Sequence, residues 1–369
     1  MVTYMIPCLL GLEKLVADEV KRLGLQDVQA ENGRILCRGT AADCARLNIN
    51  LRCGARVMMV LGQFPARSFE ELFQGVRAIP WEDYLPRDAA FPVKGYAISS
   101  QLHAVSACQS IIKKAMVERM KAAYGLEQFP ETGVKYQVRF SIFKDEAAVC
   151  LDTSGEGLYK RGYRAVGVEA PLRETLAAAL LDVSPWRTRM PLYDPCCGTG
   201  TILIEAAIKA AARPAGIDRS FVCEDFPFMK NVPMVAIRQA EREKIPADRS
   251  FSITGSDIDP EALELCRRHI HQAGFDGQIT VQQQDLRTLQ VPGEPGVFLC
   301  NPPYGERLGD KREAEALYRE MGLLLKRHPG WKLCAITSDF AFERCFGRRA
   351  THKRRLYNGR LECEFYIFE

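Results

Sequence analysis

The sequence predicts an α/β fold in which a parallel sheet, covered by helices on both faces, occupies the second half of the chain. Strand-like apolar segments there alternate with segments that have apolar residues at helical spacing. Such alternation is typical of a parallel sheet with helices on both faces. The chain then ends differently, because Asn358-Gly359 separates two strand-like segments and favours a two-residue type I′ turn. We therefore expect the last two strands to pair antiparallel.

The elements of this second half follow one another from about residue 168. The expected strands are Leu192–Asp194, Phe251–Asp257, Ile279–Asp285, Val297–Asn301 and Leu333–Ser338. The expected helices are Thr175–Leu181, Thr201–Ala212, Glu261–Ala273 and Ala314–Lys326. Between the second helix and the second strand, residues 213–249 form a long insertion that the pattern only partly places.

The first 155 residues mix helices and strands without this regular alternation. The expected helices are Leu12–Leu23, Thr40–Leu51, a segment from Ser68 through Val76 with a capping box, and Ser106–Ala123. The expected strands are Gly33–Arg38, Val57–Phe64, Val93–Ser99 and a hairpin of Tyr136–Phe143 with Ala147–Asp152. Because this half lacks a motif that carries chemistry, we interpret it as a binding module.

Composition limits the classes of protein that the chain can represent. Its 369 residues predict two or three domains, and 47% hydrophobic residues indicate a globular protein. No stretch reaches the 18 or so apolar residues of a membrane-spanning helix, and the N-terminus does not resemble a signal peptide. The 14 cysteines are scattered without a CxxC pair, and the five histidines lack metal spacing. We expect a cytoplasmic protein without a metal or a membrane partner.

A glycine-containing loop, Asp-Pro-Cys-Cys-Gly-Thr-Gly-Thr at residues 194–201, connects an expected strand to an expected helix. Gly198 and Gly200 allow the backbone to turn sharply and to approach a ligand. In parallel sheets, ligands bind beyond the carboxyl ends of the strands. The third glycine of the dinucleotide pattern GxGxxG is missing, which favours a small zwitterionic ligand such as S-adenosylmethionine. A tight turn without function is the alternative.

Acidic residues end the next two strands. The Asp257 carboxylate, in GSDIDPEAL, is placed to accept hydrogen bonds from both hydroxyls of a ribose. Asp259 fits the cap of the following helix, with Pro260 in its first turn. Asp285 ends the third strand, where an acid can meet an adenine amino group. Each acid alone could be a simple cap, but with Asp194 they end three successive strands.

The tetrapeptide Asn301-Pro302-Pro303-Tyr304 follows the apolar strand Val297–Cys300. The Asn301 side-chain carbonyl and the Pro302 backbone carbonyl can each accept a hydrogen bond from an NH2 group. The prolines stiffen the loop, so the two acceptors would orient an amine toward a methyl donor. Tyr304 would stack on the target ring. We interpret the tetrapeptide as a site of methyl transfer to an exocyclic amine, and a proline-rich turn is the alternative.

Three sequence segments, DPCCGTGTILIEAA, GSDIDPEA and NPPYGERLG, resemble class I methyltransferases that act on guanine N2 in RNA. APLRETLAAALL and LYKRGYR are similar to the same family. The first half resembles a THUMP module behind a ferredoxin-like segment, with ISSQLHAVSACQSIIKKA as its most characteristic stretch. Over nearly the whole chain, the likeness is to the RlmL/YpsC-like bacterial rRNA guanine-N2 methyltransferases. We do not expect the second methyltransferase domain that the fused enzymes of this family have.

The resemblance implies the domains, the ligands and the site residues. It implies a ferredoxin-like segment at 1–43, a THUMP RNA-binding domain at 44–154, a linker at 155–167 and a Rossmann-like class I methyltransferase domain at 168–369. It implies S-adenosyl-L-methionine as cofactor and RNA as partner. The implied cofactor-binding residues are Asp194, Cys196, Gly198, Gly200, Thr201, Asp257, Ile258, Asp285 and Asn301. The implied catalytic residues are Asn301, Pro302, Pro303 and Tyr304.

Basic residues indicate RNA contacts in three parts of the chain, although each group could also be an ordinary solvated surface. These residues are Lys113 and Lys114 in the long helix, Lys160 and Arg161 near the expected linker, and Arg348, Arg349, Lys353 and Arg354 before the C-terminal hairpin.

Methylation of guanine N2 in 23S rRNA is the leading hypothesis for the function. The NPPY motif also occurs in adenine-N6 DNA methyltransferases and in protein glutamine methyltransferases, so it indicates an amine target only. The THUMP likeness is what selects RNA. Three alternatives stay open: a tRNA guanine-N2 methyltransferase, an adenine-N6 DNA methyltransferase and a non-catalytic RNA-binding assembly factor.

Overall fold

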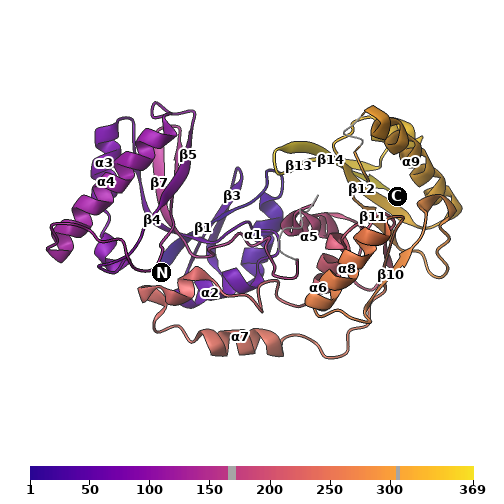
Figure 1. Ribbon diagram of the computed structural model, residues 1–369, viewed down its shortest axis with the longest axis horizontal. Helices are drawn as coiled ribbons and strands as arrows, with labels where there is room; N and C mark the ends of the chain where they lie inside the picture. Colours follow the sequence, from indigo (N-terminus) through magenta and orange to yellow (C-terminus); the bar gives the residue numbers. More distant parts are fainter. Residues whose placement is uncertain (165–171, 305–307) are drawn as a thin grey trace.

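The structure, a computed structural model, describes residues 1–164, 172–304 and 308–369, without the side chains of residues 308–310. The chain forms two lobes, each built on a seven-stranded sheet (Figure 1). One set of contacting buried apolar side chains includes Tyr4 in the first lobe and Phe365 in the second. The two lobes therefore share a hydrophobic core.

The N-terminal sheet has the strand order β2-β3-β1-β4-β7-β6-β5. Its strands are β1 (Val2–Pro7), β2 (Gln26–Glu31), β3 (Arg34–Gly39), β4 (Met58–Pro65), β5 (Val93–Ile98), β6 (Val138–Phe143) and β7 (Glu146–Asp152). Neighbouring strands pair antiparallel except β5 and β6, which are parallel. The sequence pattern does not predict β1 or β2. Strand β1 has adjacent apolar residues without clear alternation and ends at Pro7, and β2 is mostly polar, so only their partners define them.

Four helices of the N-terminal lobe match the predicted ones within two residues. They are α1 (Glu13–Arg22), α2 (Ala41–Asn50), α3 (Phe69–Ala78) and α4 (Val105–Tyr124), and a short helix η1 (Trp81–Asp83) follows α3. Thr40 and Asp43 form a complete capping box on α2. On α3 the box is incomplete, because the Glu71 carboxylate accepts from the Arg67 N–H instead. The predicted domain division at 43/44 falls inside α2, which is continuous there.

The C-terminal sheet has the strand order β10-β9-β8-β11-β12-β14-β13. Its strands are β8 (Leu192–Asp194), β9 (Ile253–Asp257), β10 (Ile279–Gln283), β11 (Val297–Cys300), β12 (Lys332–Thr337), β13 (His352–Asn358) and β14 (Leu361–Phe368). Strands β8 to β12 are parallel, while β14 pairs antiparallel with β12 and β13. Gly359 has φ +67°, as the predicted turn requires. The expected parallel sheet with a C-terminal hairpin is confirmed.

The helices of the C-terminal lobe are α5 (Glu174–Val183), α6 (Thr201–Ala210), α8 (Pro260–Gln272), η4 (Leu286–Thr288), α9 (Leu308–Arg327) and α10 (Phe342–Phe346). Helix α9 begins six residues before its predicted start at Ala314, and the sequence pattern does not predict α10. In the described residues, no helix is long and apolar enough to cross a membrane.

The insertion at residues 213–249 forms a strap that returns to the N-terminal lobe. It contains η2 (Val222–Asp225), η3 (Pro227–Met229) and α7 (Met234–Glu243), which lies beneath α2 in Figure 1. The Gly216 N–H donates to the Ile49 carbonyl at 2.8 Å. The Phe226 ring stacks on Tyr136 with centroids 4.4 Å apart. The insertion therefore fastens one lobe to the other.

The segment expected to be a linker is partly buried where the structure describes it, because Leu158, Arg161 and Tyr163 are buried while Glu156 and Lys160 are exposed. The Arg161 side chain is 3% exposed and pairs with Glu205 of α6 at 3.1 Å. Its guanidinium also donates to the Leu158 carbonyl at 2.8 Å and to the carbonyl of Arg52. The prediction that Arg161 contacts RNA is therefore wrong, because its donors are used to join the lobes. Residues 165–167 of the expected linker lie outside the described residues.

Candidate active site

The glycine-containing loop turns between β8 and α6 at the carboxyl end of the parallel sheet. Gly198 and Gly200 have φ +48° and +86°, a region that residues with a Cβ rarely adopt. A Cβ on Gly200 would lie 2.6 Å from the Cys266 sulfur. We expected Gly200 to contact a cofactor, but it does not line the cleft described below. Its role is to let the loop turn against α8.

The two acids on β8 and β9 hold this loop. Asp194 is buried and accepts a hydrogen bond from the Cys196 N–H at 3.1 Å. Burial, with Asp257 adding to it, raises the pKa of the Asp194 carboxyl well above its usual value. Asp257 accepts from the Gly198 N–H at 2.8 Å and from the Asp259 N–H at 3.1 Å. A carboxylate has about four acceptor positions, so Asp257 can still bind two hydroxyls.

Asp285 follows β10 and is already held by a neighbour. The Arg287 guanidinium forms a two-pronged pair with the Asp285 carboxylate, with distances of 2.6 to 3.0 Å. This hydrogen bonding lowers the pKa of Asp285. Asp285 also caps η4 through the Arg287 N–H at 2.8 Å. An adenine amino group at this carboxylate would share it with Arg287, whose side chain is mostly exposed.

The tetrapeptide after β11 is fixed by two tyrosines. The Tyr318 hydroxyl of α9 donates to the Pro303 carbonyl at 2.9 Å. The Tyr304 hydroxyl donates to the Asn301 side-chain carbonyl, the acceptor predicted for an amine. Burial raises the pKa of Tyr304. The Asn301 oxygen has a second acceptor position, so an amine can bind it while the Tyr304 hydroxyl stays in place.

One cleft of about 1560 Å³ joins these segments. The predicted site residues that line it are Asp194, Cys196, Gly198, Thr201, Asp257, Ile258, Asp285, Asn301, Pro302, Pro303 and Tyr304. Sites for small ligands commonly occupy about 300–1,000 Å³, so the cleft has room for a cofactor and a target base. Ile258 lines the cleft, is 64% exposed and offers an apolar surface beside Asp257.

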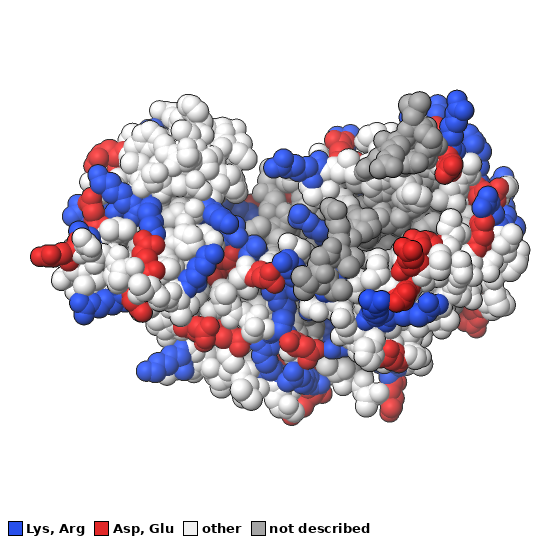
Figure 2. All heavy atoms as spheres, in the orientation of Figure 1, with Lys and Arg blue, Asp and Glu red and all other residues white. Residues whose placement is uncertain are grey.

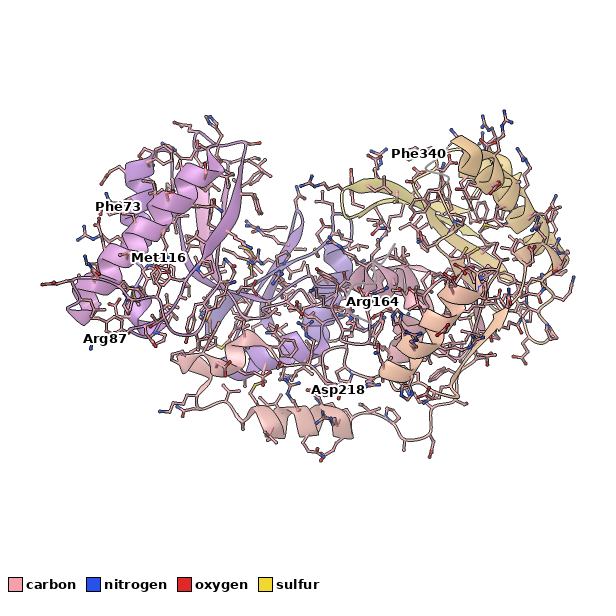
Figure 3. All side chains as sticks on the ribbon, viewed as in Figure 1. Phe73, Arg87, Met116, Arg164, Asp218 and Phe340 are labelled. Atoms are coloured by element: carbon pink, nitrogen blue, oxygen red, sulfur yellow. The ribbon has the colours of Figure 1, made fainter. Side chains whose placement is uncertain are left out.

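Arg164 supports the cleft, a role that the sequence analysis does not predict for it. Arg164 lies next to α5 between the lobes (Figure 3). Its guanidinium pairs with Glu174 at 3.0 Å and donates to the Thr201 hydroxyl at 2.8 Å and the Thr199 hydroxyl at 3.3 Å. Arg164 therefore clamps the start of α6. The segment LYKRGYR contains this residue, but only the fold brings it to the loop.

The turn of the C-terminal hairpin also reaches the cleft, through Asn358, Gly359 and Leu361. Because β13 and β14 are antiparallel, this turn lies at the same sheet edge as the carboxyl ends of β11 and β12. The NG signal predicts the turn but not its proximity to the tetrapeptide.

The basic residues predicted on the N-terminal side lie apart from this cleft. Lys113 on α4 is 2.6 Å from Glu131, so its charge is matched. Lys114 is 3.9 Å from Glu118 and is well exposed. Lys160 is exposed and pairs with a neighbouring glutamate at 2.6 Å. None of these three lysines lines the cleft.

The basic residues near the hairpin are exposed. Arg348 donates to the C-terminal main-chain oxygen, and Lys353 pairs with Glu343 at 2.9 Å. Arg349 is exposed. Arg354 on β13 donates to the Gly11 carbonyl of the N-terminal lobe at 3.4 Å. This edge strand therefore presents cations where the two lobes meet.

A buried charge cluster also lies at this junction. Glu19, Cys53 and Asp182 bring possible metal ligands within 4.8 Å of one another. Two cations share the cluster, because Arg52 and Lys209 lie 3.1 Å and 2.7 Å from Asp182. We interpret it as an ion network between the lobes. Burial raises the pKa of Glu19 in spite of the nearby Arg52.

The fold and the cleft define a Rossmann-like methyltransferase domain attached to an α+β lobe. The RMKL-like methyltransferase domain model, UPF0020, matches residues 161–367. The RlmL ferredoxin-like domain matches residues 3–58, and the THUMP domain matches residues 66–152. The chain therefore belongs to the RMKL-like methyltransferase family, with RlmL-type ferredoxin-like and THUMP domains.

Similar proteins cover the chain almost completely. "Putative RNA methyltransferase YpsC" of Bacillus subtilis is 38% identical over 97% of this chain and 94% of its own length. "Ribosomal RNA large subunit methyltransferase K/L" of Psychromonas ingrahamii is 31% identical over 98% of this chain. The chain spans 49% of that relative, about half its length.

Solved structures extend the likeness. A "predicted N6-adenine-specific DNA methylase" from Listeria monocytogenes is 41% identical, with a TM-score of 0.94 over 100% of this chain and 96% of that one. "SMU.472, a putative methyltransferase complexed with SAH" is 38% identical, with a TM-score of 0.92 over 100% of this chain and 97% of that one.

Proposed function

We propose that the protein transfers a methyl group from S-adenosylmethionine to the exocyclic N2 amine of a guanine in large-subunit ribosomal RNA. The observation that carries this proposal is the single cleft in which the glycine-containing loop, the strand-end acids and the NPPY tetrapeptide meet. The family supports a methyltransferase, and SMU.472 is described in complex with SAH, the product left after methyl transfer.

The residues of the cleft fit this cofactor. At Gly198 the backbone of the loop lines the cleft. The positive φ of this residue favours glycine, so no side chain separates the backbone from a ligand. Asp257 keeps free acceptor positions for a pair of ribose hydroxyls, and the exposed Ile258 beside it can cover an apolar ring. The sulfonium of the bound cofactor supplies an electrophilic methyl group, so the protein has no need to generate one.

The protein's contribution to the reaction is orientation of the amine. The Asn301 side-chain carbonyl and the Pro302 backbone carbonyl accept hydrogen bonds from the amine. These bonds direct the nitrogen lone pair toward the methyl group. Tyr318 fixes the tetrapeptide through the Pro303 carbonyl. The Tyr304 hydroxyl keeps the Asn301 amide in one orientation before the substrate arrives. On binding of the base, the Tyr304 ring stacks on it.

The choice of RNA rests on the N-terminal lobe and on the relatives. THUMP and ferredoxin-like domains fill that lobe, and the K/L relatives are named for large-subunit ribosomal RNA. Guanine N2 as the target rests on the resemblance of the three sequence segments to guanine-N2 methyltransferases. The tetrapeptide indicates an exocyclic amine without specifying the base. The experiment therefore has to identify the methylated base directly.

The test compares nucleosides from purified 23S rRNA and tRNA of a deletion strain by mass spectrometry. We expect one N2-methylguanosine to disappear from 23S rRNA and to return with the wild-type protein but not with Asn301→Ala. Loss of the contact made by Asn301 should lower turnover by roughly 10²–10³-fold. Loss of N2-methylguanosine from tRNA only, or of a methylated adenine, would refute the assigned substrate. Unchanged nucleosides with no S-adenosylmethionine binding by calorimetry would refute the enzymatic role.

A further inference from the structure

One face of the N-terminal sheet is exposed where it borders the edge strand β5. Strand residues alternate between its faces, and Val138, Phe140 and Ile142 of β6 point into the core that the helices cover. Their neighbours on β6 and β5 point the other way. Tyr96 is 50% exposed, Ile98 53% and Phe143 43%. Toward β1 the same face is buried, in a separate small cluster of Met5, Met58, Ala148 and Cys150, so the exposed part is confined to β5 and β6.

The outward residues of the two strands are paired across the sheet. Lys94 lies opposite Arg139, and Ile98 lies opposite Phe143. Strand β5 is the edge of the sheet. Proteins usually protect an edge strand and avoid clusters of large exposed apolar side chains unless the surface binds a partner. The open face around Lys94, Tyr96, Arg139 and Phe143 is therefore a candidate binding surface.

Most of the charges on this face are positive, although the exposed Glu146 lies opposite Phe143. Arg139 donates to Asp152 at 2.7 Å, and Arg56 donates to the same carboxylate at 2.8 Å. Asp152 is fully buried, while the side chains of Arg139 and Arg56 are 29% and 23% exposed, so two partly exposed arginines share one hidden carboxylate and keep a net positive charge. Lys94 is exposed and forms no ion pair among the described residues. Lys144 lies 5.3 Å from the centre of the Phe143 ring.

Aromatic rings interleaved with cations are the surface that single-stranded nucleic acids recognise, through stacking of bases and neutralisation of phosphates. Outward side chains on β5 repeat every two residues, about 6.6 Å apart. In Figure 1, β5 lies on the side of α3 and α4 that faces the C-terminal lobe. Figure 2 shows Lys and Arg side chains along the notch between the two lobes.

We propose that the open face around Lys94, Tyr96, Arg139 and Phe143 binds single-stranded RNA. Bases stack on Tyr96 and Phe143, while Lys94 and Arg139 contact phosphates. The RNA then lies on the face opposite to α4, where Lys113 is neutralised by Glu131. This inference deepens the proposed function and depends on RNA as the substrate.

The test measures binding of a fluorescein-labelled 12-nucleotide single-stranded RNA of mixed sequence to the full-length protein by anisotropy. We expect Tyr96→Ala to weaken binding by roughly 5- to 150-fold, the range for loss of one stacked base. Tyr96→Phe keeps the ring and should bind within about twofold of wild type. Lys94→Ala should reduce the slope of log K against log salt by about 0.7.

Phe69→Ala is the matched control, because Phe69 is 40% exposed on α3, outside the open face. It should leave RNA affinity unchanged. Unaltered RNA binding by folded Tyr96→Ala and Lys94→Ala would overturn the proposal. Unaltered RNA binding with a changed sedimentation coefficient would overturn it in favour of a protein interface. These outcomes concern the surface alone, whereas the loss or persistence of methylated guanine in the deletion strain decides the proposed function.

Discussion

Replacement of Arg161 by alanine tests whether this residue joins the lobes or contacts RNA. Arg161 pairs with Glu205 at 3.1 and 3.3 Å and donates to the Leu158 carbonyl at 2.8 Å. The Glu205 side chain is 0% exposed, so the substitution leaves a carboxylate buried without its cation. Removal of one partner from a buried pair costs about 3–5 kcal/mol. We expect Arg161→Ala to lower the free energy of unfolding by that amount.

Two further variants separate charge from geometry. Arg161→Lys keeps a cation but loses the planar donors that reach both Glu205 and the backbone carbonyls, so it should recover only part of the stability. The double variant Arg161→Met with Glu205→Leu removes both charges and should be more stable than Arg161→Ala. Lys160→Ala is the neighbouring control, because Lys160 is exposed and its solvent-screened surface pair with Glu156 contributes little to stability.

The assay is urea unfolding followed by tryptophan fluorescence and circular dichroism. Trp81 lies in the N-terminal lobe, while Trp186 and Trp331 lie in the C-terminal lobe, and all three are buried. The binding of the 12-nucleotide RNA to the folded fraction is measured in parallel and should stay near the wild-type affinity. An Arg161→Ala protein that unfolds like wild type but binds RNA weakly would refute the structural role.

Three other substitutions test the cleft and the junction. Asp257→Ala should weaken S-adenosylmethionine binding in calorimetry by about 1.5–3 kcal/mol, whereas the helix cap variant Asp259→Ala should lower stability by about 1 kcal/mol and keep the affinity. Arg164→Ala should weaken cofactor binding about fivefold, since a hydrogen bond to Thr201 contributes about 1 kcal/mol, and unchanged affinity would remove its clamping role. Burial raises the pKa of Glu19, so its ionisation opposes folding. Glu19→Gln should therefore match wild type at roughly pH 4 and gain relative stability as pH rises toward 7, and equal stability at both pH values in urea unfolding would contradict this.

The sequence by itself determined the features that depend on local periodicity and backbone freedom. The alternation of strands and helices, the Asn358-Gly359 turn and the helices of the N-terminal lobe follow from patterns within a few residues. The sharp turn at Gly198 could be predicted because it depends only on the residues of the loop itself, and its positive φ favours glycine. The cleft could be expected for a similar reason, since the carboxyl ends of parallel strands meet at one sheet edge.

Only the tertiary structure decided the features that depend on distant partners. Strand β1 lacks a clear apolar alternation, and β2 is too polar, so neither is defined without its partners β3 and β4. Arg161 has the sequence appearance of a solvated cation, yet Glu205, 44 residues away, makes it a buried one. Burial and ion pairing are properties of the assembled lobes, and the pattern around a residue does not specify which distant charge it meets.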